Sequence, residues 1–282
     1  MNTQEQRADE IRLEVERSDP APGSVALWWL GQASVLLKGG GATVYVDPFL
    51  SEMDALLTPP PFPPASAPRA DLVFVTHDHI DHLDDQTLPA LARSAPEARF
   101  VLPAPLVSRL VGFGIPERRI VGVRADEAVE LGAVRATPIP AMHAFDPPTT
   151  YGFERDSEDR HAYVGYILQF GSVSLYHAGD TVIYDGLVER LRRHEVDLGL
   201  LPINGRSYFR EQDDIVGNMD EREAAELAGR AGFKTVIPIH YDMFAGNLGR
   251  PGLFVEHLRA AHPGASCVLP ALARRYTYIA GG

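Results

Sequence analysis

Short apolar runs, separated by glycine, proline and polar residues, set the pattern of this chain. Three such runs, at residues 25–30, 34–37 and 43–46, follow one another closely and predict a meander of strands. From residue 72 onward, strand-like runs alternate with segments whose apolar positions recur at helical spacing. Further strands are predicted at residues 72–75, 99–102, 164–170, 172–176, 197–203 and 235–239, and helices at residues 83–94, 104–113, 186–194 and 252–261.

The mixture of antiparallel meanders and β-helix-β units predicts an α/β fold in which sheets are flanked by helices. Asp220 and Glu223 form a capping pair at the start of a further helix. Residues 1–23 are a charged lead-in, interpreted as a surface helix or a frayed end. Residues 24–282 are expected to form one domain, because no segment is long enough to be a linker. Residues 58–70 hold six prolines and predict a loop, a candidate cover for a site.

Composition narrows the classes of function. Hydrophobic content is 45%, and no apolar run approaches the roughly 18 residues that a membrane span requires. The N-terminus leads into charged residues, so no secretion signal is predicted. The single cysteine, Cys267, excludes an internal disulfide, and we expect a cytoplasmic protein. The formal charge of −12 disfavours nucleic acid as a partner and leaves a homo-oligomer open.

The candidate chemistry is concentrated in one short stretch. His77, His79, Asp81 and His82 follow directly on the predicted strand at residues 72–75. His77 and His79 stand two residues apart, so an extended backbone directs both side chains to one side. Imidazoles and carboxylates are costly to bury unpaired. A divalent cation is the usual reason for such a cluster, and nitrogen and oxygen ligands suit zinc, manganese or iron.

Polar residues also stand at the ends of four other apolar runs. They are Asp47, His143, Asp180 and His240. Strand ends are where a rigid sheet presents side chains to a site. The residue types at these ends suit metal ligands or the groups that orient such ligands. The sequence therefore predicts one metal centre built from distant segments.

These residues carry a family resemblance. The order aspartate, His-x-His-x-Asp-His, histidine, aspartate, histidine along residues 47–240 resembles the metallo-β-lactamase fold superfamily. Within it, residues 28–31, 76–79, 174–180 and 236–240 closely resemble the L-ascorbate-6-phosphate lactonase family. Residues 47–51 and 178–181 also resemble N-acyl phosphatidylethanolamine phospholipase D and its bacterial relatives. Related branches often carry histidine at the position of Gln32, so no ligand is expected from that strand.

The resemblance implies an αβ/βα four-layer sandwich, with two mixed β-sheets flanked by helices, and a centre for two divalent ions, Mn²⁺ or Zn²⁺. The implied ligands of one ion are His77, His79 and His143, and those of the other are Asp81, His82 and His240. Asp180 is implied to lie between the two ions. Asp47 would orient a ligand histidine. Asp81 and His82 are the implied catalytic residues, Asp81 passing a proton to the leaving alkoxide after a metal-bound hydroxide attacks.

Polar residues beyond position 203 are candidates for substrate contacts. They are Asn204, Arg206, Tyr208 and Tyr241. Arginine forks onto the oxygens of a phosphate or carboxylate, which makes Arg206 the natural anion contact. The alternative is a solvated loop in which Arg206 pairs with the acidic residues after it: Glu211, Asp213 and Asp214.

Other interpretations stay open at individual positions. His143 stands in a proline-rich stretch and could contact substrate instead of metal. Asp47 precedes a proline, which on its own is a turn signal. His177 is interpreted as a packed structural neighbour of the site and His161 as a loop residue.

The function implied is a metal-dependent hydrolase acting on a small molecule. The expected reaction opens a sugar-derived lactone, phosphorylated or not, such as L-ascorbate 6-phosphate. The nearest alternative is hydrolysis of a phosphodiester in a lipid head group, a cyclic nucleotide or RNA. A catalytically degenerate metal-binding scaffold is the third reading.

Overall fold

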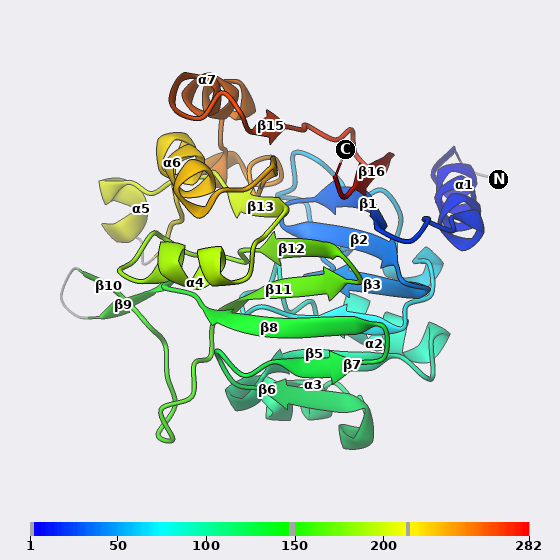
Figure 1. Cartoon of the computed structure of the whole chain (residues 1–282). Helices are drawn as coiled ribbons and strands as arrows, with labels where there is room; N and C mark the ends of the chain where they lie inside the picture. Colours follow the sequence, from blue (N-terminus) through cyan, green and yellow to red (C-terminus); the bar gives the residue numbers. More distant parts are fainter. Residues whose placement is uncertain (1–2, 147–149, 213–214, 282) are drawn as a thin grey trace.

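Two mixed sheets packed face to face form the body of the protein (Figure 1). The computed structural model describes residues 3–146, 150–212 and 215–281. The first sheet contains, in spatial order, β16 (Arg275–Ile279), β1 (Ser24–Gly31), β2 (Ser34–Gly39), β3 (Ala42–Val46), β4 (Leu72–Phe74), β5 (Arg99–Pro103) and β6 (Ile120–Val123). The second contains β15 (Ser266–Cys267), β14 (Thr235–Ile239), β13 (Leu198–Pro202), β12 (Val173–His177), β11 (Val164–Phe170), β8 (Val134–Pro140) and β7 (Val129–Leu131).

Each sheet is antiparallel at one end and parallel at the other. In the first sheet, β16, β1, β2 and β3 are antiparallel neighbours, and β3 to β6 are parallel. In the second, β7, β8, β11 and β12 are antiparallel, and β12 to β15 are parallel. A small hairpin of β9 (Ala144–Asp146) and β10 (Thr150–Gly152) stands apart from both sheets (Figure 1).

Helices cover the outer faces of the two sheets. The first sheet packs against α1 (Thr3–Arg17), α2 (Thr87–Ser94) and α3 (Val107–Gly112). The second packs against α4 (Leu187–Arg193), α6 (Glu221–Ala231) and α7 (Pro251–Ala261). The remaining short helices are α5 (Tyr208–Gln212), η1 (Pro64–Ser66), η2 (Ala104–Leu106), η3 (Glu117–Arg119) and η4 (Ala245–Asn247). The layers confirm the predicted αβ/βα sandwich (Figure 1).

Side chains that alternate along each strand contribute to two separate parts of the hydrophobic core, one between the sheets and one beneath the helices. In β2, Val35 and Leu37 point between the sheets, whereas Leu36 points outward to the helices. Successive side chains of a strand face opposite sides, so an apolar run with no polar alternation is expected where both faces are covered. No helix in the described part of the chain combines the length and the apolarity needed to cross a bilayer.

The predicted elements occur with local differences. The lead-in contains α1, which buries Ala8, Ile11 and Val15 against the first sheet. The predicted capping box of Asp220 and Glu223 starts α6. The helix predicted at residues 83–94 begins only at Thr87, after a turn at the end of the histidine cluster.

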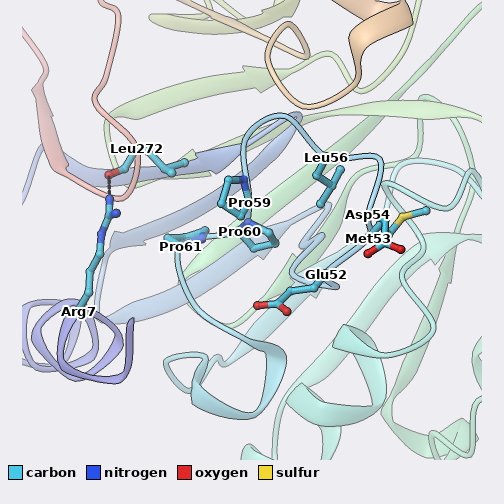
Figure 2. Close-up of a pocket in the computed structure, with 9 residues that line it drawn as sticks. All are labelled: Arg7, Glu52, Met53, Asp54, Leu56, Pro59, Pro60, Pro61 and Leu272. Atoms are coloured by element: carbon cyan, nitrogen blue, oxygen red, sulfur yellow. Dashed lines mark hydrogen bonds between the residues drawn. The ribbon is translucent and has the colours of Figure 1, made fainter. Parts of the chain in front are cut away.

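The proline-rich segment packs beside the chain that follows β14. The Leu57 amide donates to the Met243 carbonyl at 2.8 Å, and the Thr58 hydroxyl donates to the Asp242 carbonyl at 3.2 Å. A pocket with a volume of about 910 Å³ lies on the side of this segment that faces α1. Figure 2 shows the residues that line it. Its lining includes the three consecutive prolines and Arg7, whose guanidinium donates to the Leu272 carbonyl at 3.2 Å (Figure 2). The predicted site residues are not among its lining residues.

One buried carboxylate explains the late start of α2. Asp84 is 2% exposed, and its oxygens accept hydrogen bonds from the amides of Gln86 and Thr87 at 2.9 and 3.1 Å. The same carboxylate accepts from the amides of Leu50 and Ser51 at 3.2 and 3.1 Å. Asp84 therefore caps α2 and also connects the loop that follows β3 to the start of this helix.

We expect Asp84→Ala to lower the free energy of unfolding by about 3 kcal/mol, because several buried donors lose a charged acceptor. Urea denaturation followed by circular dichroism measures this change. The neighbouring Asp85 is exposed, so Asp85→Ala serves as the matched control and should leave the stability near wild type. Equal stability of the two variants would contradict the role given to Asp84.

Candidate metal centre

The site lies where strands of both sheets end. Asp47 follows β3 and His77 lies just beyond β4, so both come from the first sheet. His143, Asp180 and His240 follow β8, β12 and β14 of the second sheet. The structure brings these five segments together, and their ionisable side chains are almost entirely buried.

The first group of potential ligands consists of His77, His79, His143 and Asp180. One donor atom from each residue lies within 4.8 Å of those of the others. His77 Nε2 is 3.0 Å from His79 Nδ1, and His143 Nε2 is 3.4 Å from Asp180 Oδ2. The aspartate therefore lies beside imidazoles from two different sheets.

The second group consists of Asp81, His82 and His240, again with donor atoms within 4.8 Å of one another. His240 Nε2 lies 3.2 Å from Asp81 Oδ2 and 3.2 Å from Asp180 Oδ2. The other oxygen of Asp180, Oδ1, is 3.5 Å from His82 Nε2. Asp180 thus stands between the two groups.

Hydrogen bonds on the far side of the rings orient the imidazoles. His82 Nδ1 lies 2.7 Å from Asp47 Oδ2, and the Thr76 amide donates to Asp47 Oδ1 at 2.8 Å. His143 Nδ1 lies 3.2 Å from the Gly217 carbonyl. A proton held on Nδ1 leaves the Nε2 lone pair directed into the site, which is the usual arrangement behind a metal ligand.

Burial and nearby charges shift the pKa values of the site histidines in opposite directions. Burial, reinforced by nearby imidazoles, holds the pKa of His77 well below its ordinary value and lowers the pKa of His143 to about 4. Burial is the largest single influence on His82 and His240 and opposes their charge, but the carboxylates around them, Asp180 and Asp81 for both and Asp47 for His82, together outweigh it. The pKa of His240 is raised to about 9, and that of His82 lies well above its ordinary value.

The donor set fits divalent cations. His82 Nε2 and Asp180 Oδ1 are buried and make no hydrogen bond within the described residues. Buried polar atoms without partners are rare and costly, so they mark a place where another group binds. Imidazole nitrogens and carboxylate oxygens, three or four to a group, are the ligands that zinc and manganese take.

The predicted substrate contacts have partners outside the two groups of potential ligands. The Arg206 guanidinium pairs with Glu223 at 2.5 Å and donates to the Asn218 carbonyl at 3.0 Å. Its partner is therefore the capping residue of α6. Of the acidic residues expected as alternative partners, Asp213 and Asp214 lie outside the described residues. The guanidinium of Arg206, the predicted anion contact, is therefore already bonded to neighbouring segments of the chain.

The other three candidates differ in exposure. Asn204 is buried, and its amide donates to Asn247 Oδ1 at 2.6 Å. Tyr208 is 68% exposed. Tyr241 stacks on Trp29 with ring centroids 5.2 Å apart. Of these, Tyr208 has the most surface free for a ligand.

Two histidines outside the cluster behave as the sequence indicated. His177 is buried, with Nε2 2.8 Å from the Ala33 carbonyl and Nδ1 accepting from the Gly179 amide at 3.2 Å. Both ring nitrogens are satisfied by backbone, as expected of a structural residue. His161 packs on Phe153 in a loop away from the cluster, with ring centroids 5.1 Å apart.

The sequence did not reveal the groups that surround the potential ligands. The Gly217 carbonyl behind His143 is a backbone group, and no side-chain pattern signals it. Tyr163 stands edge-on to His77 and His79, with ring centroids 5.1 and 5.6 Å apart. Its position just before β11 carried no charged or metal-binding signal.

Comparison with known proteins agrees with this geometry. The family model described as a beta-lactamase superfamily domain matches residues 42–241. A protein of Shigella boydii serotype 4 (strain Sb227), named probable L-ascorbate-6-phosphate lactonase UlaG, is 27% identical over 278 residues, spanning 86% of this chain and 76% of its own. Its counterpart in Escherichia coli O127:H6 is 27% identical over 272 residues, spanning 83% of this chain and 74% of its own.

Solved structures share the fold. Igni18, a metallo hydrolase from Ignicoccus hospitalis, superposes with a TM-score of 0.69 at 21% identity, covering 90% of this chain and 98% of its own. An isothiocyanate hydrolase from Delia radicum gut bacteria gives a TM-score of 0.70 at 18% identity, covering 90% of this chain and 100% of its own. The matched family model spans both groups of potential ligands. This chain belongs to the β-lactamase superfamily, among its metal-dependent hydrolases.

Proposed function

We propose that this protein is a two-metal hydrolase that opens a small lactone. The observation that carries the proposal is the position of Asp180, whose carboxylate faces both groups of imidazoles. In this proposal His77, His79 and His143 hold one ion, Asp81, His82 and His240 hold the other, and Asp180 contacts both. Mn²⁺ and Zn²⁺ both suit this donor set.

Bound there, two divalent cations supply Lewis-acid activation of a water and of the substrate oxygen. The chain's own residues then supply orientation and proton transfer. Asp81 is 14% exposed, whereas His82 has no exposed surface and His240 is 2% exposed. Asp81 is therefore the carboxylate of the second group that can reach a substrate, and we assign it the proton transfer to the leaving oxygen. His82 acts as a ligand that Asp47 orients.

The lactone assignment draws on the curated relatives, which are named probable L-ascorbate-6-phosphate lactonases. A ring-opened product keeps its leaving oxygen tethered, so one proton donor at the site is enough to release the hydroxy acid. For an anionic substituent on the substrate, Tyr208 is the exposed candidate, since Arg206 is paired with Glu223. Phosphodiester hydrolysis uses the same donor set and is the alternative outcome of the substrate test.

Substrate choice tests the proposal directly. Protein loaded with Mn²⁺ or Zn²⁺ should open ascorbate-type lactones with a kcat/KM at least about tenfold above that for a generic phosphodiester chromogen. Preferential turnover of the diester would defeat the lactonase assignment. Absence of turnover on every lactone, ester and diester by fully loaded protein would favour a non-catalytic scaffold.

Replacing Asp180 tests the paired centre. Asp180→Ala should lower the metal content from about two ions per chain to less than one, because both positions lose a ligand. Elemental analysis after equilibrium dialysis measures the stoichiometry, and His161→Ala, outside the cluster, is the control that should retain both ions. Two tightly held ions in the Asp180 variant would rule out its assigned position between them.

Replacing Asp47 tests the orienting hydrogen bond. Asp47→Asn keeps the size of the side chain but removes the charge behind His82, so activity or metal affinity should fall by roughly 10- to 100-fold. Asp71→Asn is the matched control, because Asp71 also accepts a backbone amide, from Thr43 at 2.8 Å, but lies outside the site. Wild-type kinetics and affinity in the Asp47 variant would show that this carboxylate does not tune the site.

A further inference from the structure

Gln32 contacts the second group of potential ligands, but it has not been assigned to either ion. It lies in the turn between β1 and β2, is 0% exposed, and has a φ of 48°, which is uncommon for a residue with a side chain. Its backbone amide donates to Asp242 Oδ1 at 2.9 Å, and its backbone carbonyl accepts from the His240 amide at 2.9 Å. The turn is thereby fixed to the segment that carries His240.

The side chain of Gln32 enters the second group of ligands. Its Nε2 donates to Asp81 Oδ2 at 2.8 Å. The same nitrogen lies 3.3 and 3.2 Å from Nδ1 and Nε2 of His240. Nearly equal distances to both ring nitrogens place the amide against the face of the imidazole, since an approach in the ring plane would collide with the carbon between them. The terminal amide therefore contacts two of the three residues in this group.

The oxygen of this amide has no partner. Gln32 Oε1 is buried and makes no hydrogen bond within the described residues, and the same holds for His82 Nε2 and Asp180 Oδ1. These three atoms come from three different strand ends that meet at the second group, where His82 Nε2 is 3.5 Å from Asp180 Oδ1 and 3.7 Å from Asp81 Oδ2. One cation in the second group would satisfy His82 Nε2 and Asp180 Oδ1 as they lie, and Gln32 Oε1 once its amide rotates toward that group, whereas each atom alone is a costly burial.

We propose that Gln32 is a further ligand of the second ion, through its amide oxygen. This rests on the proposed two-metal function. Rotation about the last side-chain bond exchanges Oε1 and Nε2 with little change of shape, so the oxygen reaches the position that Nε2 holds beside Asp81 and His240. An oxygen facing Asp81 is unfavourable alone and becomes favourable with a cation between them. The strand from which no ligand was expected therefore supplies one.

An amide oxygen is a neutral, hard donor, which suits manganese better than it suits zinc. Gln32 thus also bears on which metal the second position prefers. Its removal should cost more affinity for Mn²⁺ than for Zn²⁺.

The test compares Gln32→Leu with wild type by calorimetric titration of Mn²⁺ and Zn²⁺. The first ion should bind unchanged, and the affinity for the second Mn²⁺ should fall about tenfold or more because one ligand is lost. With Co²⁺ in both positions, visible absorption should intensify in the variant as the coordination number of the second ion falls. Gln169→Leu, in β11 and away from the site, is the matched control and should behave as wild type.

Each result decides the question. Wild-type affinity for the second ion and an unchanged Co²⁺ spectrum in Gln32→Leu would overturn the ligand role and leave the proposed function standing. A wild-type protein that binds a single ion would overturn both. Should Gln32→Leu fail to fold, Gln32→Glu decides instead. It retains an oxygen donor, so it should hold the second ion at least as tightly as wild type, and a weaker second ion would contradict the proposal.

Discussion

The burial of one carboxylate among several imidazoles is the constraint on which this structure depends. Asp180 is 4% exposed and lies within 4.0 Å of nitrogens from four histidines, His77, His82, His143 and His240. Removing so many ionisable groups from water is unfavourable unless they are paired with one another and with a further charge. The hydrophobic core between the sheets provides the opposing free energy, and the donor geometry leaves places that cations fit.

Contacts between the two sheets set the positions of these side chains. The Val164 amide, at the start of β11, donates to the Thr76 carbonyl at 3.1 Å, and the Tyr166 hydroxyl donates to the Val75 carbonyl at 2.9 Å. His177 reaches the Ala33 carbonyl from the other direction. Backbone groups next to the ligands are therefore tied across the interface, so the site is rigid only when both sheets are packed. This explains how the loop at residues 77–82, beyond β4 of the first sheet, is held against the residues that follow strands of the second sheet.

Local sequence was sufficient for the strands, the capped helix and the residues that gather in the two groups of potential ligands, because each has a signal within a few positions. It could not reveal partners that only tertiary packing supplies. Arg206 pairs with Glu223 at the start of α6, and the Gly217 carbonyl behind His143 has no side-chain signature. The start of α2 at Thr87 follows from the buried Asp84 carboxylate, whose other partners lie in a distant loop.

In the proposed function, residues of both sheets form one paired-cation centre. The most direct measurement is anomalous diffraction from crystals of the protein soaked with Mn²⁺ or Zn²⁺, recorded at the absorption edge of the metal. Two peaks are expected, one beside His77, His79 and His143 and the other beside Asp81, His82 and His240, each within ligand distance of Asp180. Peaks confined to the surface, or a single ion that does not contact Asp180, would contradict it.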